Sequence, residues 1–134
     1  MFVINLIIGM ILIILAVFLL TYLITFLFPI IEVCGSSMFP TYKDGEILFG
    51  TRFIRKSSLK VGDVVLYNTK HITGDKKIVI KRIADIKMVD GSLYFMCLGD
   101  NSKVSYDSRY YGYVPSYLII GKPMNKYQRK QVKE

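Results

Sequence analysis

Cysteine and histidine are too scarce in this chain to build a metal site or a disulfide scaffold. The sequence contains two cysteines, Cys34 and Cys97, and one histidine, His71. Zinc and redox sites need clustered ligands such as a C-x-x-C pair, and no such cluster is present. We expect free, buried thiols, with a single disulfide as the alternative if the domain faces an oxidising compartment. We expect no metal and no cofactor.

Charge is absent from the first part of the chain. From Met1 to Ile31 there is no Asp, Glu, Lys or Arg, and Ile, Leu, Val and Phe dominate. A helix needs roughly 20 apolar residues to cross a bilayer, whereas a secretory signal has a basic start and a shorter apolar run. The segment 1–31 is therefore predicted to be a transmembrane anchor. A lipoprotein-type signal before Cys34 is disfavoured because Glu32 and Val33 are not small residues.

Basic residues are confined to the remainder of the chain. All 18 Lys and Arg residues follow Ile31, and the net charge is +8. Beside a membrane, this charge predicts attraction to a lipid bilayer with anionic head groups. We expect no nucleic-acid partner, because the chain has no zinc-finger or RNA-binding signature. The basic tail 125–134 is predicted to be a solvated or membrane-grazing end.

Residues 32–124 carry the pattern of short β-strands. Runs of β-branched and aromatic residues occur at 46–49, 63–67, 78–86, 93–98 and 117–120. Asp90-Gly91 is a strong signal for a tight hairpin, and no helical periodicity is sustained after the apolar segment. The predicted fold is mostly β, a compact antiparallel β domain preceded by a single N-terminal transmembrane α-helix.

Two segments carry residues suited to nucleophilic chemistry. The loop Gly35-Ser36-Ser37-Met38-Phe39-Pro40-Thr41 combines two hydroxyls with turn residues, although on its own it is better explained as a turn leaving the membrane. In 77–83, strand alternation places Lys81 beside apolar neighbours and Arg82 on the opposite face, free to stay in solvent. Burial lowers the pKa of a lysine, which makes its amine a usable base. A surface lysine is the simpler explanation without the serine loop.

A third segment, from Gly99 to Gly112, is dense in hydroxyls and charges directly after an apolar strand, which favours a functional loop. Asp107 and Arg109 are separated by one residue, so in an extended stretch both point the same way and can form a salt bridge. A polar turn network is the simpler explanation.

Together these segments resemble the type I signal peptidases, whose nucleophile lies in a Ser-Met-x-Pro-Thr loop and whose base lies in a Lys-Arg strand. The resemblance extends from the apolar segment through Gly62-Asp63-Val64-Val65 to Gly121-Lys122-Pro123. It implies a membrane-bound serine endopeptidase with a Ser-Lys dyad that cleaves signal peptides from exported preproteins. The tight turn at Asp90-Gly91 leaves no room for the extra β domain of larger members, so the chain is a minimal form.

The resemblance also implies residue roles. Ser37 is the nucleophile, neutral Lys81 is its general base, and Ser105 orients the Lys81 amine. The supporting residues are Gly35 and Ser36 in the nucleophile loop and Asp100, Asp107 and Arg109 around it. The Ser37 backbone N–H is the expected oxyanion donor, and Gly35, which replaces the serine of some members, leaves the second donor open.

Substrates are expected, by the same resemblance, to carry small residues one and three positions before the cut. The candidate substrate-binding residues near the serine are Cys34 and Met38, and the substrate backbone is expected to add as a strand to an exposed sheet edge. The resemblance places the catalytic domain on the extracytoplasmic face of the cell membrane. The positive-inside rule favours the opposite orientation, because Lys43 follows the apolar segment and no basic residue precedes it.

Other functions stay open on the sequence alone. A self-cleaving protease of the repressor type shares the Ser-Lys chemistry but would need DNA-binding helices, and a silent membrane adaptor would use the β domain to bind peptides. The segment Ser57-Ser58-Leu59-Lys60 matches the S-x-x-K pattern of penicillin-recognising enzymes without its companion motifs. His71 is expected to be a loop residue, because Lys81 occupies the position of the base histidine of related enzymes.

Overall fold

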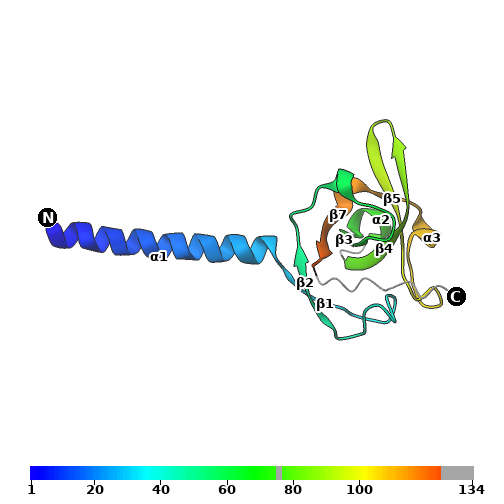
Figure 1. Ribbon diagram of the computed structural model, residues 1–134, viewed down its shortest axis with the longest axis horizontal. Helices are drawn as coiled ribbons and strands as arrows, with labels where there is room; N and C mark the ends of the chain where they lie inside the picture. Colours follow the sequence, from blue (N-terminus) through cyan, green and yellow to red (C-terminus); the bar gives the residue numbers. More distant parts are fainter. Residues whose placement is uncertain (75–76, 125–134) are drawn as a thin grey trace.

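The computed structural model describes residues 1–74 and 77–124, so the predicted tail 125–134 lies outside the described residues (Figure 1). Its N-terminal element is one long helix, α1 (Phe2–Leu27), which projects away from a β domain. No residue of α1 is buried, and the helix is long and apolar enough to cross a membrane. At about 1.5 Å per residue it extends roughly 39 Å, against about 30 Å for a hydrocarbon core.

The β domain is built on a single antiparallel sheet. Its strands are β1 (Ile30–Glu32), β2 (Ile47–Thr51), β3 (Val64–Asn68), β4 (Ile78–Val89), β5 (Ser92–Leu98), β6 (Val114–Pro115) and β7 (Ile119–Pro123). They lie in the order β1-β2-β7-β3-β4-β5-β6. Within the described residues, four short helices connect the strands: η1 (Lys56–Ser58), α2 (Lys70–Thr73), α3 (Ser108–Tyr111) and η2 (Ser116–Leu118). The predicted fold class, mostly β behind an apolar helix, is confirmed.

The strand predictions agree best with the structure at the hairpin, which is set by two adjacent turn residues. Asp90 and Gly91 both have positive φ, 48° and 75°, and form the predicted hairpin between β4 and β5. The prediction at 117–120 is partly wrong, because η2 occupies residues up to Leu118 and the strand begins one residue later. The sequence pattern does not predict β1 and β6, since two or three residues are too few to show alternation.

Both faces of the sheet are covered by apolar side chains. One cluster contains Leu59, Val65, Tyr67, Ile83, Phe95, Cys97, Val114, Leu118 and Ile119. The other contains Val33, Met38, Tyr42, Leu48, Leu66 and Ile80. Because side chains alternate along a strand, β4 contributes Ile83 to the first cluster and Ile80 to the second. Lys81 thus shares a face with Ile83 and lies against the first cluster.

Candidate active site

The serine loop, between β1 and β2, is held by contacts on both sides of Ser37. The Asn101 backbone N–H donates to the Ser37 carbonyl (2.9 Å), and the Asn101 amide donates to the Ser36 carbonyl (3.1 Å). On the other side, the Met38 side chain is fully buried in the core, and its carbonyl accepts a hydrogen bond from the Tyr42 N–H (3.0 Å). The backbone around the Ser37 hydroxyl is therefore fixed in place.

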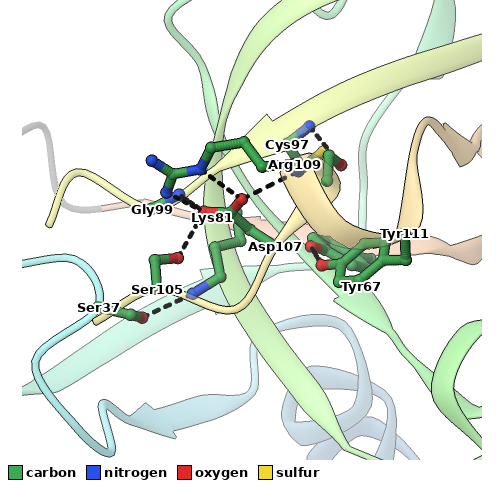
Figure 2. A network of polar contacts seen from close by, with 10 residues as sticks. Ser37, Tyr67, Lys81, Cys97, Gly99, Ser105, Asp107, Arg109 and Tyr111 are labelled. Atoms are coloured by element: carbon green, nitrogen blue, oxygen red, sulfur yellow. Dashed lines mark hydrogen bonds and ion pairs between the residues drawn. The ribbon is translucent and has the colours of Figure 1, made fainter. Parts of the chain in front are cut away.

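Lys81 reaches this hydroxyl from β4. Its Nζ lies 2.6 Å from Ser37 Oγ, in hydrogen-bond contact, and the residue is only 4% exposed (Figure 2). Burial is the largest influence on the pKa of Lys81 and lowers it, because the apolar surroundings disfavour the ammonium. The negative charges of Asp107 and Asp100 oppose this shift without reversing it. The site can therefore present an uncharged amine to a serine hydroxyl.

The neighbouring Arg82 is partly exposed, but its guanidinium is bound, which corrects the prediction that it is free in solvent. Its guanidinium donates to both carboxylate oxygens of Asp100 at 2.8 Å and to the Gly62 carbonyl at 2.7 Å. The Thr41 hydroxyl donates to the same Asp100 carboxylate. Strand alternation does place Arg82 on the opposite face from Lys81, but the loop after β5 folds back over that face. Asp100 thereby ties the serine loop to β4.

A second carboxylate, Asp107, organises the loop behind Lys81 (Figure 2). It is fully buried and accepts hydrogen bonds from the Gly99 N–H (2.8 Å), the Ser105 hydroxyl (2.6 Å) and Arg109 Nε (2.9 Å). The salt bridge to Arg109 is confirmed, although its geometry differs from the predicted one, because Asp107 caps the N-terminus of α3. Burial would raise the pKa of Asp107, but these hydrogen bonds outweigh burial and hold it well below its ordinary value.

Ser105 lies beside the site, but its hydroxyl does not make the expected contact. It donates its one proton to Asp107, an ionised acceptor, and among the described residues no hydrogen bond joins it to Lys81. The orientation of Lys81 by Ser105 therefore stays a prediction. An ionised carboxylate is a strong acceptor, and it accepts the hydrogen bond of the Ser105 hydroxyl.

Gly99 allows the loop after β5 to approach the serine loop closely. A β-carbon at this position would lie 2.6 Å from the Ser37 carbonyl oxygen and 2.2 Å from Ser105 Oγ, so any side chain would force the two loops apart. Together with Asn101 and Thr41, Gly99 forms a supporting set that the sequence analysis misses. The sequence marks the segment from Gly99 to Gly112 as a functional loop, but which loop it supports depends on the fold.

The predicted substrate-binding residues differ in exposure. Met38 has no exposed surface and its side chain anchors the loop in the core, so its assignment as a substrate contact stays a prediction. Cys34 is exposed and stays a prediction. Both cysteines are free, but only Cys97 is buried, and burial raises the pKa of its thiol to about 12. His71 is exposed and lies in α2.

Removing the charge of Asp107 is expected to destabilise the β domain. In Asp107→Asn, the bonds to Arg109, Ser105 and Gly99 lose their ionised acceptor, and we expect a loss of about 2–3 kcal/mol in the free energy of unfolding, because Arg109 is partly exposed. Since the folded-state pKa of Asp107 is lowered, this stabilisation is present above its ordinary pKa and fades as the pH falls below it. Urea unfolding at neutral and acidic pH measures both effects.

Asp90→Asn, at the exposed hairpin turn, is the matched control and should change the stability little, because Asn tolerates positive φ. Equal stabilities of the two variants at neutral pH would contradict the role of the buried carboxylate.

An antiparallel β domain behind an apolar helix, with a serine hydroxyl against a buried amine, is an arrangement suited to a membrane-associated serine hydrolase. The family model described as signal peptidase, peptidase S26, matches residues 5–87 and 84–127. These matches cover most of the chain, so the chain belongs to the signal peptidase family S26, and it is a serine peptidase. The resemblance to type I signal peptidases is thereby confirmed. No curated protein matches the chain significantly.

Proposed function

We propose that the chain is a membrane-anchored endopeptidase that cleaves signal peptides from exported preproteins, with Ser37 as nucleophile and neutral Lys81 as general base. The observation that carries this proposal is the 2.6 Å contact between Lys81 Nζ and Ser37 Oγ at a lysine that is almost fully buried. Cleavage of a preprotein substrate by the purified chain in detergent or lipid tests it. The expected product has lost its signal peptide.

The first half of the reaction forms an acyl-enzyme. Ser37 Oγ attacks the scissile carbonyl carbon while its proton passes to Lys81 Nζ, and the carbonyl oxygen becomes an oxyanion. The C–N bond then breaks, the electron pair leaves with the amine of the mature protein, and the Lys81 ammonium returns a proton to that amine. In the second half, Lys81 takes a proton from water while the water oxygen attacks the ester carbonyl carbon. The bond between that carbon and Ser37 Oγ then breaks, the Lys81 ammonium returns the proton to Ser37 Oγ, and the signal peptide leaves with a new carboxyl group.

The oxyanion requires donors placed where the charge develops, and the Ser37 backbone N–H is the one we assign. The Gly35 N–H is already occupied, because it donates to Asp44 Oδ1 at 2.7 Å. Gly35 also has a positive φ of 84°, which favours glycine there. Gly35 and Ser36 thus shape the loop, and the second donor is left unassigned.

The surrounding polar residues act as positioning residues in this proposal. Asp107 and Arg109 hold the loop that carries Ser105, while Asp100 holds Arg82 and Thr41. Because the Ser105 O–H donates a hydrogen bond to Asp107, the lone pairs of the Ser105 oxygen are available to accept from the Lys81 ammonium that forms during the reaction. Ser105 would then orient Lys81 in the charged state.

The location and organisation of the chain complete the proposal. Residues 1–31 form the membrane anchor, 32–124 the peptidase domain and 125–134 a basic tail, with the peptidase domain on the extracytoplasmic face where exported preproteins emerge. β1 is an edge strand of the sheet and leads into the serine loop, which supports addition of the substrate backbone at this edge. Cys34, exposed between β1 and Ser37, is the candidate that contacts the substrate there.

Activity is expected to rise with pH at values where an ordinary lysine is still charged. The base must be neutral to accept the Ser37 proton, and the lowered pKa of Lys81 moves the rising limb of kcat/KM below the ordinary lysine value of 10.5. Peptide cleavage, with a substrate that does not titrate in this range, gives the profile. A rising limb at 10.5 itself would show that the amine is not desolvated.

A further inference from the structure

Two tyrosine hydroxyls that the proposed reaction does not use are paired beside the site. Tyr67 lies on β3 and is fully buried, and its hydroxyl is hydrogen-bonded to that of Tyr111, the last residue of α3 (Figure 2). Neither hydroxyl makes another hydrogen bond among the described residues. Burial raises the pKa of both phenols, that of Tyr111 to about 12, so both stay protonated at neutral pH. The pair is therefore an uncharged hydrogen bond.

Burial decides which of the two hydroxyls donates. A phenol has one proton to donate, and Tyr67 is shut off from water. If Tyr111 donated, the Tyr67 proton would have no acceptor, and a donor without an acceptor is costly in a core. Tyr111 is partly exposed, so its own proton can be donated to water. Tyr67 is therefore the donor and Tyr111 the acceptor.

The pair attaches α3 to a second strand of the sheet. We call residues 105–112 the α3 segment. On one side it is held to β5, where the Cys97 N–H donates to Ser108 Oγ at 3.0 Å. On the other side Tyr67 holds Tyr111 to β3. Because β4 lies between β3 and β5, the α3 segment is held on both sides of β4.

Lys81 lies on the face of β4 that the α3 segment crosses. It pairs with Val65 in the antiparallel ladder, and Tyr67 is two residues further along β3, so all three share a face. After burial, the strongest influences on the pKa of Lys81 are the charges of Asp107 and Arg109, both in the α3 segment. The α3 segment therefore lies close to the amine.

The carboxylate of Asp107 does not by itself fix how the α3 segment lies over β4. Its hydrogen bonds to Ser105 (2.6 Å) and Arg109 (2.9 Å) are internal to the segment, so they set its shape and not its tilt. Within the described residues, the tyrosine pair is the hydrogen bond that joins the segment to β3. Its loss would free the β3 side of the segment.

We propose that the hydrogen bond from Tyr67 to Tyr111 is a positioning contact for the reaction, which holds the α3 segment over Lys81 and keeps the Lys81 amine on the Ser37 hydroxyl. This rests on the proposed function. Neither tyrosine reacts. A displaced segment would admit water to the amine and move it relative to Ser37 Oγ, so loss of the contact should lower kcat and leave KM unchanged.

Phenylalanine substitutions test the contact, because they remove the hydroxyls and keep the rings. Tyr111→Phe leaves the buried Tyr67 proton without an acceptor, so we expect kcat to fall about tenfold with KM within about twofold of the wild-type value. Tyr67→Phe leaves the Tyr111 hydroxyl to water, and kcat should fall about threefold. The double variant should resemble Tyr67→Phe, because no donor is then left without an acceptor.

The charge of Lys81 is a readout that a merely structural contact would not move. In full chains labelled with ¹³C-lysine in detergent, the Lys81 Cε resonance reports the protonation of the amine and is identified by its absence from Lys81→Met. We expect its titration midpoint to lie below 10.5 in the wild type and to rise by about half a pH unit in Tyr111→Phe, because a displaced segment admits water. The rising limb of kcat should move with it.

Tyr113→Phe is the matched control. The Tyr113 hydroxyl donates to Asp85, four residues beyond Lys81 on β4, and its loss should change neither kcat nor the midpoint. A wild-type kcat with an unmoved midpoint in Tyr111→Phe overturns the positioning role, as does a loss of kcat that only follows the unfolded fraction measured by circular dichroism. A double variant slower than Tyr111→Phe overturns the assignment of the donor.

Failure of the proposed function gives a different result. A wild-type chain that cleaves no preprotein overturns the peptidase activity, and the titration, which needs no catalysis, still decides whether the tyrosine pair controls the burial of Lys81.

Discussion

Ser37→Ala should reduce kcat/KM for signal-peptide cleavage by a factor of roughly 10⁴ to 10⁶, because no acyl-enzyme forms without the hydroxyl. The fold should be retained, since the Ser37 carbonyl still accepts from Asn101 and Met38 still fills the core. Processing of a preprotein and urea unfolding, measured on the same preparation, separate lost chemistry from lost structure.

Ser57→Ala is the matched control. Ser57 is exposed, lies in η1 and belongs to the Ser57-Ser58-Leu59-Lys60 segment that resembles an S-x-x-K motif. We expect its variant to cleave at the wild-type rate. Unchanged processing by Ser37→Ala would remove Ser37 from its role and require another nucleophile. Absence of processing by the wild-type chain itself would favour a chain that binds peptides without cutting them.

Lys81→Met should lower kcat/KM by a factor of roughly 10³ to 10⁵, because Met fills the same space without offering a base. The second expectation is a free energy of unfolding that is unchanged or higher by about 1 kcal/mol, since replacing a buried ionisable group by an apolar one removes its desolvation penalty. Loss of activity without loss of stability is the signature of a group retained for chemistry. Single-turnover cleavage and urea unfolding provide the two measurements.

Lys60→Met serves as the matched control, because Lys60 is exposed and its side chain makes no contact described for this site. It should leave both activity and stability near the wild-type values. If Lys81→Met retained the wild-type rate, the 2.6 Å contact with Ser37 would be structural and another base would be required.

The buried amine explains why the surrounding carboxylates are arranged as they are. Asp107 and Asp100 favour the charged form of Lys81, yet each is already neutralised by an arginine, Arg109 and Arg82 respectively. Arginine pairing therefore limits how far these carboxylates raise the pKa of Lys81. The loops gain strong hydrogen-bond acceptors while the pKa of Lys81 stays below its ordinary value.

The features that the sequence determined by itself are local ones. The apolar run that forms α1, the alternation of β4 and the positive-φ turn at Asp90-Gly91 each depend on a few consecutive residues, so their pattern can be read without knowing the fold. The Ser-Met-x-Pro-Thr loop and the Lys-Arg strand are also short segments. They were sufficient to indicate the family and both candidate reactive residues.

Only the tertiary structure decided which of these segments meet. Ser37 and Lys81 are 44 residues apart, and their contact depends on how the sheet packs and on the absence of a side chain at Gly99. The burial of Met38 and the capture of Arg82 by Asp100 likewise arise from neighbours distant in sequence. Local periodicity specifies which face a side chain points to, but only the packed chain specifies what covers that face.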